Sequence, residues 1–421
     1  MLPPSLEIDW GRWLRPGDHV VCSHMSSQPR ALLQSLLQHR PVMPLSLMLG
    51  VAFSPDMSAA PDVWQLQGLG AMGSGSVVAS QRALSLSTLT YCVYEQVYAQ
   101  ALWPVDVVLV SLSRDPQGRL YLGASHGAAL AAARRARVVL AEINAQAPCL
   151  LGSQWPADVP IHAQWDTAYA PPELSAGPAG EAEQTIGQHL ATRVPEGACL
   201  QVGMGGLPSA LLECLSGHRR LGVHSGMYGQ AMHRLLLSGA IDNSEKSIDR
   251  GLCVIGCVAG PAEFLAQTDQ HPALRLRSPA YTHEALNIQA IGNFFSLNTA
   301  LEVDLLGQVN AEAIVDEHGR WRYVGGIGGL PDFARAAMRA PAGQSVIALP
   351  ARTPRGRSRI VAKLSGPATL AASDADLIVT EHGVAELRHA SVDQRVMRMV
   401  AIADPIERPA LLAQARAIGW L

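Results

Sequence analysis

The sequence predicts an α/β protein with two open, twisted, mostly parallel sheets and flanking helices. Three observations support this fold class. The chain has 421 residues, which is more than one hydrophobic core usually accommodates, so two domains are expected. Strand-like runs alternate with helix-like runs in both halves, as in parallel sheets covered by helices. A glycine-rich hexapeptide, GxGGLP, occurs twice, each time between a strand-like run and a helix-like run.

In the N-terminal half, strand-like runs alternate with helix-like runs along the chain. In order, these runs cover residues 20–23, 29–38, 105–113, 128–137 and 138–144. They predict an N-terminal α/β domain over residues 1–170. Residues 56–102 include a Gly/Ser-rich stretch with neither the strand nor the helix period, and we interpret them as an extended loop that crosses toward the second domain.

Residues 171–183 are predicted to form a linker, because this Pro-, Ala-, Gly- and Glu-rich stretch has no apolar periodicity. After it the alternation resumes, with runs at residues 183–194, 198–203, 207–215, 221–225, 230–239 and 252–258. These runs predict a C-terminal α/β domain over residues 184–421.

A charged turn follows the strand-like run LIVT near the end of the chain. We expect a helix to begin near Val384, directly after the turn that contains Glu381 and His382. A carboxylate at a helix start interacts favourably with the helix dipole, so Glu381 is interpreted as an N-terminal cap.

Composition and charge exclude several classes of protein. The net charge is −3, from 32 basic and 35 acidic residues, so no partner among nucleic acids or anionic membranes is expected. The N-terminal residues lack the apolar segment of a signal peptide, and no run of about eighteen apolar residues occurs, so a cytoplasmic location is expected. The seven cysteines are scattered without a CxxC pair, which predicts reduced thiols and no metal site.

The two GxGGLP copies, at residues 203–208 and 326–331, predict two anion sites lined by backbone amides. The first amides of a helix have no partner within the helix, and the helix dipole favours negative charge there. Proline fits early in a helix because its missing N–H would be unpaired anyway. Neither copy reads GxGxxG with an acidic residue about twenty positions later, so NAD is not expected as a cofactor.

Two polar residues end the strand-like run at 221–225. In open α/β sheets, ligands bind at the carboxyl ends of strands, so His224 and Ser225 are placed at the edge of the same crevice as the first GxGGLP copy. A hydrolase nucleophile elbow reads GxSxG, whereas Gly222 to Gly226 reads GVHSG. The serine-nucleophile signal is therefore weak, and the alternative for His224 is a structural histidine at a strand end.

Polar residues also interrupt the apolar segment at 296–312. Alternation along a strand places Glu302 and Asp304 on one face, with Asn298 nearby. Because buried polar groups need partners, a hydrogen-bond network is implied. The alternative to direct chemistry is that Asp304 and Gln308 bond the backbone of the turn around Gly307.

Taken together, these segments resemble the acetyl-CoA hydrolase/transferase family, which includes 4-hydroxybutyrate CoA-transferase. The matching stretches run in the family's order from about Gly17 to Pro409. They include LQVGMGGLPSALL, LGVHSGMYG, SLNTALEVDLLGQVNAE, YVGGIGGLPDFARAA, SVIALPARTPRGRSRIV and LIVTEHGVAELRHASVDQR. The resemblance implies a CoA-transferase-like fold, acyl-CoA bound in an interdomain cleft as the substrate, a small carboxylate as its partner, and a homodimer or higher homo-oligomer.

The resemblance also assigns roles to particular residues. Gly203, Gly205 and Gly206 match the family's oxyanion loop. The residues that match the family's CoA-contacting positions are Gly326, Ile327, Gly328, Gly329 and Asn298. Transferases of this family read HTEM at the strand end, with the glutamate as nucleophile, whereas this chain reads HSGM, with Gly226 in place of the glutamate.

The missing nucleophile leaves three hypotheses open. A carboxylate from elsewhere, such as Glu95 or Glu302, replaces it and preserves CoA transfer between a small acyl-CoA and a carboxylate such as acetate or 4-hydroxybutyrate. Alternatively, the vacant position admits water or a larger acyl group, giving a thioester hydrolase, a decarboxylase or a lyase. In the third hypothesis, the chain binds CoA thioesters without turning them over.

Overall fold

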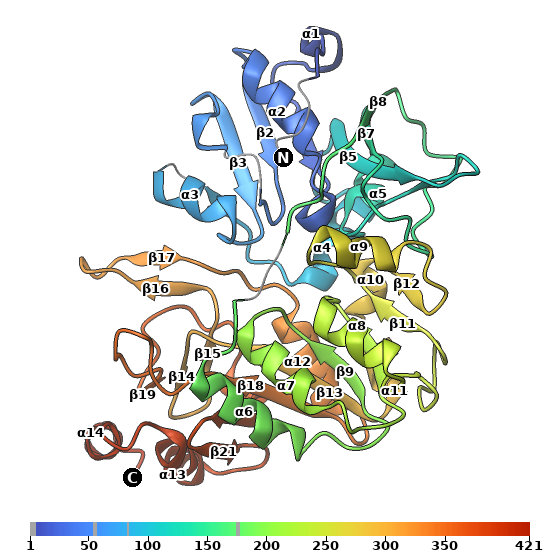
Figure 1. The fold of residues 1–421 in the computed structure, drawn as a ribbon. Helices are drawn as coiled ribbons and strands as arrows, with labels where there is room; N and C mark the ends of the chain where they lie inside the picture. The colour runs from blue at the N-terminus through green and yellow to red at the C-terminus, as the bar shows by residue number, and fades with distance from the viewer. Residues whose placement is uncertain (1–5, 54–56, 82–83, 174–176) are drawn as a thin grey trace. The chain divides into compact units, whose positions relative to one another are not determined.

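The computed structural model describes residues 6–53, 57–81, 84–173 and 177–421 (Figure 1). Helices and strands alternate along the described chain and form two large, mostly parallel sheets with helices on their faces. The predicted fold class is therefore confirmed. Within the described part of the chain, no helix is both long enough and apolar enough to cross a membrane.

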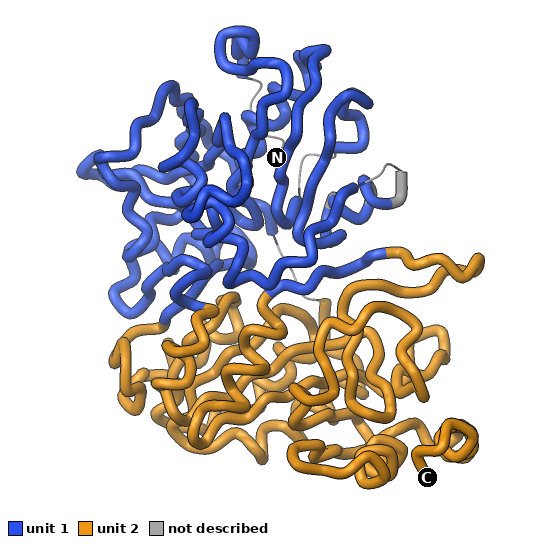
Figure 2. Tube along the Cα trace, turned by 180° about the vertical axis from the view of Figure 1, so that it is seen from behind, with its two compact units in different colours: residues 1–175, 254–282, 323–328 blue, residues 176–253, 283–322, 329–421 orange. Residues whose placement is uncertain are grey.

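The chain divides into two compact units (Figure 2). Unit 1 comprises residues 1–175, 254–282 and 323–328, and unit 2 comprises residues 176–253, 283–322 and 329–421. The predicted domains were continuous, so the two later segments of unit 1 differ from that prediction. Backbone hydrogen bonds explain one of them, because the amide of Val258 donates to the carbonyl of Ala124 over 2.7 Å. Such pairing between distant segments leaves no periodic signal in the sequence.

Unit 1 contains the first sheet, whose strands run in the order β4–β3–β2–β1–β5–β7–β8, with β6 paired to β5. All of these pairs are parallel except β5 with β6. The strands are β1 (His19–Cys22), β2 (Leu45–Met48), β3 (Trp64–Gly68), β4 (Ser85–Leu86), β5 (Val107–Arg114), β6 (Leu120–Tyr121), β7 (Val138–Asn144) and β8 (Ala163–Thr167).

Helices pack on both faces of this sheet. One core joins α2 to the even-numbered residues of β1 and the odd-numbered residues of β5, while the other joins α4 and α5 to the opposite face. The helical segments of unit 1 are α1 (Trp10–Trp13), η1 (Met25–Ser27), α2 (Arg30–His39), η2 (Met57–Ala59), α3 (Ser74–Gln81), α4 (Tyr91–Ala99), α5 (Ala129–Ala133), α9 (Ala262–Thr268) and α10 (Pro279–Thr282). Both faces are therefore apolar, as expected of a parallel sheet.

The prediction of an extended loop over residues 56–102 is wrong for the residues described there; Asp56 and residues 82–83 lie outside them. The segment contributes β3 and β4 to the sheet, and α3 and α4 besides. In β3, Trp64 and Leu66 are buried while Gln65 is exposed, which is a strand period too short to be recognised beside a glycine-rich stretch. The Gly/Ser-rich part begins at the turn after β3 and continues into α3.

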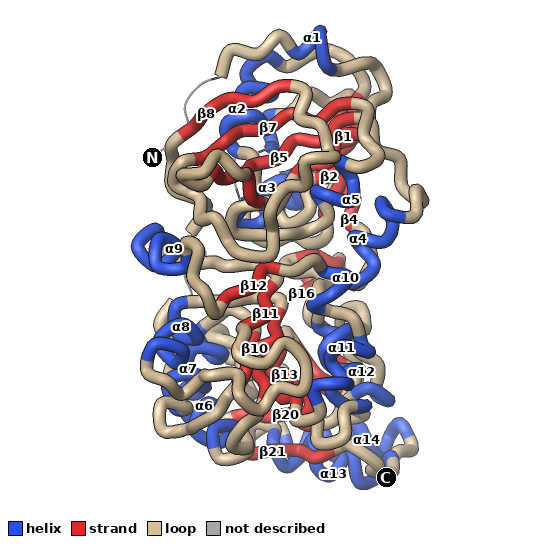
Figure 3. The backbone as a smooth tube through the Cα atoms, turned by 90° about the vertical axis from the view of Figure 1, so that its right-hand side faces the viewer, coloured by secondary structure: helices blue, strands red, loops and turns tan. Residues whose placement is uncertain are grey.

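Unit 2 contains strands in the order β10–β9–β13–β18–β20–β21, all parallel except β20 with β21. Figure 3 shows α6, α7 and α8 on one side of these strands and α11 and α12 on the other. The strands are β9 (Cys199–Val202), β10 (Gly222–Ser225), β13 (Phe294–Thr299), β18 (Gln344–Ala348), β20 (Leu377–Thr380) and β21 (Gly383–Glu386). The helices are α6 (Glu181–Ala191), α7 (Gly206–Cys214), α8 (Gln230–Leu237), α11 (Ala285–Ile291), α12 (Leu330–Arg339), α13 (Val392–Ile402) and α14 (Arg408–Ile418).

Smaller elements complete the fold. A three-stranded sheet has the order β15–β14–β19, and a two-stranded ribbon pairs β16 with β17. Their bounds, with those of the remaining elements, are β14 (Glu302–Asp304), β15 (Val309–Asn310), β19 (Ile360–Val361), β16 (Ala313–Val315), β17 (Trp321–Tyr323), β11 (Cys253–Ile255), β12 (Leu274–Leu276) and η3 (Ala372–Asp374). The predicted linker ends inside α6, which begins at Glu181, and residues 174–176 of that linker lie outside the described residues.

The helix predicted near Val384 is replaced by strand β21, which pairs antiparallel with β20. The following helix, α13, begins at Val392, where Ser391 and Gln394 form a reciprocal capping box. Glu381 does not cap this helix. Its Oε2 accepts a hydrogen bond from the amide of Ala351 over 2.8 Å instead.

Candidate functional site

A pocket of about 260 Å³ lies at the carboxyl ends of β9, β13 and β18 in unit 2. These three strands are neighbours and parallel, so the segments that follow them meet at one edge of the sheet. The lining residues are Glu183, Met204, Gly205, Gly206, Leu207, Pro208, Thr299, Ala300, Leu301, Ala311, Ala348, Leu349, Pro350 and Arg359. The first GxGGLP copy thus opens onto a cavity.

The three glycines of this copy have different structural roles. Gly205 is the N-cap of α7 and has a φ of +137°, a conformation that side chains rarely adopt. Gly203 still belongs to the end of the strand, because its amide donates to the carbonyl of Leu297 over 3.3 Å. Gly206 and Leu207 begin the helix, so their amides have no partner within it and are available to a ligand. Gly205 and Gly206, but not Gly203, line the pocket.

A carboxylate from α6 lies beside this glycine turn. Oε2 of Glu183 accepts a hydrogen bond from the amide of Gly180 over 2.9 Å, and it would lie 2.7 Å from a Cβ at position 206. A side chain at position 206 would therefore displace this carboxylate. Within the described chain, Oε1 of Glu183 accepts no hydrogen bond, so half of this carboxylate is unused. No sequence motif marks Glu183, which lies where the predicted linker at 171–183 meets the helix-like run at 183–194.

A guanidinium also lines the pocket. Nη1 of Arg359 donates to the carbonyl of Ala300 over 3.3 Å, while Nε is buried without a hydrogen-bond partner among the described residues. Burial lowers the pKa of Arg359, and the charges of Glu183 and Glu381 act in the opposite direction. No ion pair within 4.0 Å joins Arg359 to Glu183 in the part of the chain that the structure describes. The pocket therefore contains the carboxylate of Glu183 and the guanidinium of Arg359, which form no direct ion pair with each other.

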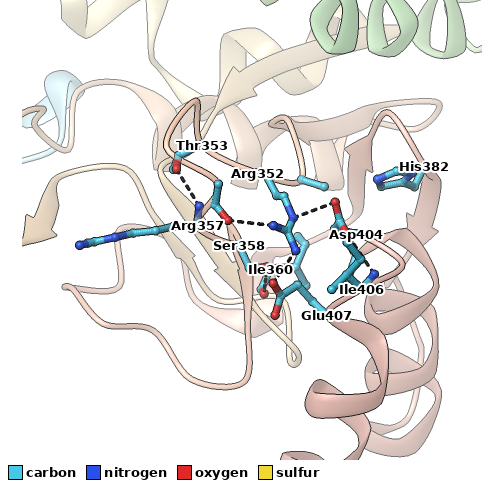
Figure 4. A network of polar contacts seen from close by, with 12 residues as sticks. Arg352, Thr353, Arg357, Ser358, Ile360, His382, Asp404, Ile406 and Glu407 are labelled. Carbon is cyan, nitrogen blue, oxygen red and sulfur yellow. Dashed lines mark hydrogen bonds and ion pairs between the residues drawn. The ribbon is translucent and has the colours of Figure 1, made fainter.

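Arg352 holds the turn that leads to Arg359, and Figure 4 shows Arg352 with its partners Asp404 and Glu407. The Arg352 guanidinium forms ion pairs with Asp404 over 2.8 Å and with Glu407 over 2.6 Å, and its Nη1 donates to the carbonyl of Gly356 over 3.0 Å. The amide of Arg359 donates to the carbonyl of Ala351 over 2.8 Å. These contacts fix the backbone on both sides of the turn and so determine where Arg359 lies.

The second GxGGLP copy is packed differently from the first. A Cβ at Gly326 would collide with the carbonyl oxygen of Leu69, and the carbonyl of Gly328 accepts a hydrogen bond from the amide of Tyr91 over 2.9 Å. Gly329 is the N-cap of α12, and a Cβ there would overlap the ring of His283. Neither these glycines nor Ile327 lines the pocket. Their assignment to CoA contacts stays a prediction, and close packing already explains two of the residues, Gly326 and Gly329.

At the end of β10, His224 and Ser225 are fully buried. Oγ of Ser225 accepts a hydrogen bond from the amide of Met227 over 3.3 Å and donates to the carbonyl of Val202 over 3.4 Å. The ring of His224 packs edge-on against Phe294 at a centroid distance of 6.4 Å. These contacts support the structural alternative for His224, and neither residue lines the pocket.

Gly226 has a close neighbour, His283, that no sequence pattern indicates. A Cβ at Gly226 would lie 2.9 Å from Nε2 of His283, a buried residue whose ring packs 4.4 Å from that of Phe333. Burial, together with the charge of His224, lowers the pKa of His283 to about 3, so the imidazole is neutral. The space that a glutamate side chain would enter is therefore already filled.

The two carboxylates considered as substitutes are engaged elsewhere. Glu302 accepts hydrogen bonds from Asn310, from the amide and hydroxyl of Ser365, and from the amide of Gly366. Oε2 of Glu95 accepts from the amide of Ala280 over 2.9 Å, at the start of α10. Neither of these glutamates lines the pocket. Glu302 thus stabilises a backbone turn and Glu95 the first turn of helix α10.

The polar network predicted around residues 296–312 is present. Oδ1 of Asp304 accepts from the amides of Leu306 and Gln308 over 3.0 and 2.9 Å, so the alternative of a turn around Gly307 is confirmed. Nδ2 of Asn298 donates to Oγ of Ser296 over 3.0 Å and to Oε1 of Gln201 over 3.3 Å. Asn298 is thus part of a network between β9 and β13, and it does not line the pocket. Among the residues that the structure describes, no group of three His, Cys, Asp or Glu side chains could hold a metal ion.

The chain is similar to known proteins in sequence. A model of the acetyl-CoA hydrolase/transferase C-terminal domain matches residues 260–415. The 4-hydroxybutyrate coenzyme A transferase of Clostridium kluyveri is 32% identical over 73% of this chain and 72% of its own length. The succinyl-CoA:cyclohexane-1-carboxylate CoA transferase of Geobacter metallireducens is also 32% identical, over 75% of this chain and 72% of its own length.

A solved structure extends the similarity to almost the whole chain. The 4-hydroxybutyrate CoA-transferase of Porphyromonas gingivalis has a TM-score of 0.80 at 27% identity, and the match covers 97% of this chain and 96% of that one. Sequence and fold thus agree with the resemblance carried by the motifs. This chain belongs to the acetyl-CoA hydrolase/transferase family.

Proposed function

We propose that this chain is an enzyme that acts on short acyl-CoA thioesters, and that its main reaction transfers CoA between a small acyl-CoA and a carboxylate such as acetate or 4-hydroxybutyrate. One observation carries the proposal. The pocket at the ends of β9, β13 and β18 combines unpaired helix amides, a guanidinium and a carboxylate in one cavity. Its similarity to named CoA-transferases supports the same reaction class.

Each group in the pocket suits one part of this reaction. Helix amides after Gly205 stabilise the negative charge that develops on a thioester oxygen during attack. The Arg359 guanidinium suits a carboxylate substrate, because charge-assisted N–H to O⁻ hydrogen bonds are strong. A volume of about 260 Å³ is at the small end for ligand pockets, which favours a short acyl group.

Thioester hydrolysis is the second candidate, and a specific observation favours it. The end of β10 presents Gly226 and the neutral ring of His283 where transferases of this family have a glutamate. Without a carboxylate there, water is the alternative nucleophile. Decarboxylase or lyase chemistry would use the same amides to stabilise an enolate, but no described contact favours it over hydrolysis.

Incubation of the protein with acetyl-CoA, butyryl-CoA or 4-hydroxybutyryl-CoA, each with and without a second carboxylate, tests the proposal. Chromatography of the CoA species separates the outcomes. A new acyl-CoA that forms only with the second carboxylate supports transfer, whereas free CoA that forms at the same rate without it supports hydrolysis. Unchanged thioesters across the panel would reject an enzyme and leave CoA-thioester binding, which calorimetry with the same compounds detects.

The oligomeric state and the cellular location are also proposals. We expect a homodimer or higher homo-oligomer, as implied by the family resemblance, and a cytoplasmic location. Light scattering coupled to size-exclusion chromatography measures the first, and fractionation of the native host measures the second.

A further inference from the structure

We propose that Glu183 is the nucleophilic carboxylate of this enzyme, in place of the glutamate that is missing at position 226. This inference rests on the proposed CoA transfer and assigns its central step to a residue. Among the pocket-lining residues, Glu183 is the one with a carboxylate. It reaches the glycine turn from α6, a different element from the strand end where the family's glutamate stands.

Hydrogen bonding separates Glu183 from Glu302, and the pocket lining, which does not include Glu95, separates it from that residue. Oε2 of Glu183 accepts from Gly180, whereas Oε1 accepts from no group in the described chain and remains available for attack. Glu302, in contrast, accepts from Asn310, Ser365 and Gly366 and is tied into a turn outside the pocket. A nucleophile needs an oxygen that is held in place and also unoccupied, and Glu183 meets both requirements.

The position of Glu183 relative to the amides is also suitable. Its Oε2 is close enough to Gly206 that a Cβ there would be 2.7 Å away, so the carboxylate lies beside the first turn of α7. A thioester oxygen held by the free amides of that turn would have its carbonyl carbon within reach of the same side chain. Arg359 lines the same pocket without an ion pair to Glu183, which leaves a cation for the departing or arriving carboxylate.

The reaction then balances without any further reagent. A Glu183 oxygen adds to the thioester carbonyl carbon, the C–S bond breaks, and CoA thiolate leaves behind a mixed anhydride. The thiolate next adds to the Glu183 carboxyl carbon, the anhydride C–O bond breaks, and the acyl group departs as its carboxylate while CoA stays on Glu183 as a thioester. A second carboxylate repeats both steps in reverse, so CoA returns to the new acyl group and Glu183 is regenerated.

Trapping and substitution test this assignment together. The wild-type protein is incubated with whichever of acetyl-, butyryl- and 4-hydroxybutyryl-CoA it uses best, without a second carboxylate, and then reduced with borohydride. Intact mass of a portion taken before reduction detects the CoA adduct, because reduction releases CoA, and peptide mapping of the reduced portion detects a primary alcohol where the thioester was. We expect both on Glu183, and we expect E183Q to lower kcat for CoA transfer by at least about 10³-fold.

The choice of variants separates a loss of catalysis from a loss of folding. Glutamine keeps an acceptor for the Gly180 amide, so E183Q should unfold at the wild-type temperature, and E181Q, which alters an exposed glutamate in the same first turn of α6, should keep wild-type activity. An adduct on another residue, or CoA transfer retained in E183Q, would overturn the assignment and leave the proposed function intact. Activity lost in E183Q without any adduct on the wild-type protein would also overturn it. A wild-type protein that leaves every thioester unchanged would instead reject the proposed function.

Discussion

The imidazole of His283 occupies the space into which a side chain at position 226 would extend. A Cβ at Gly226 would lie 2.9 Å from Nε2 and 3.0 Å from Cε1 of that ring. The ring is itself buried and packs against Phe333, so it has little room to move away. The glycine at 226 is thus a steric requirement of this chain.

The first prediction follows from this contact. G226A should lower the free energy of unfolding by about 1 to 3 kcal/mol, because it inserts a methyl group into a filled space. Urea unfolding measures the change. G217A is the matched control, since a Cβ at Gly217 meets no atom within 4 Å. In the double variant G226A/H283A the cost of the alanine at 226 should largely disappear, and a strictly additive result would contradict the contact.

The second prediction concerns Arg359 and the carboxylate substrate. R359K should raise KM for the second carboxylate by about 10- to 100-fold, because lysine replaces a planar, two-pronged donor with a point charge. The KM for the acyl-CoA should change much less. Initial rates at varied carboxylate concentration measure the effect, with R357K as the control because Arg357 is exposed on the same turn. Equal increases in both KM values would contradict a specific role in carboxylate binding.

The third prediction concerns the network around Arg352 shown in Figure 4. R352A removes the ion pairs to Asp404 and Glu407 and the bond to the Gly356 carbonyl, so the turn that carries Arg359 should loosen. Hydrogen exchange followed by mass spectrometry should show faster exchange over residues 353–359. R335A, which breaks the ion pair of Arg335 with Asp374 elsewhere in unit 2, should leave this segment unchanged. Unaltered exchange in R352A would show that β14 and β19 alone hold the turn.

The fourth prediction concerns pH and Glu142 in unit 1. This fully buried carboxyl accepts hydrogen bonds from the amides of Ala31 and Leu32 at the start of α2 and from the hydroxyl of Tyr169. Burial raises its pKa from 4.5 to about 7 against the opposing effect of these hydrogen bonds. A raised pKa means that the folded state holds the proton more tightly, so this contribution to stability is complete below pH 4.5 and is lost as the pH rises through 7.

The size of this effect follows from the shift. The contribution is about 3 kcal/mol, since one pKa unit corresponds to about 1.4 kcal/mol. E142Q stays uncharged, so its free energy of unfolding should fall less than that of the wild type between pH 4.5 and 7. Urea titrations at several pH values measure the difference, with D166N as the control because Asp166 is exposed. Parallel pH curves for E142Q and the wild type would contradict the raised pKa.

The fold class was predictable because it depends on local periodicity, which a single sequence contains. β9 and β10 end where the sequence indicated, and the first glycine-rich turn opens onto a pocket between neighbouring strand ends. Local patterns failed where a short element depends on its partner. Residues 383–386 form an edge strand because β20 offers them hydrogen bonds, although they lie in a segment that was expected to be helical.

The site was harder to predict than the fold, because its residues meet through tertiary structure. Glu183 reaches the pocket from the first turn of a helix that follows a featureless stretch. The position of Arg359 depends on a turn that Arg352 holds through its ion pairs with Asp404 and Glu407. His283 fills the space next to Gly226, a residue that lies far from it in the sequence. None of these relationships has a spacing or motif that a sequence could reveal.

The packing of His283 between Gly226 and Gly329 ties together three positions that are far apart in the sequence. A Cβ at either glycine would meet the same imidazole ring. Substitutions at 226, 283 and 329 should therefore be non-additive, and relatives with a side chain at 226 should have a smaller residue at 283.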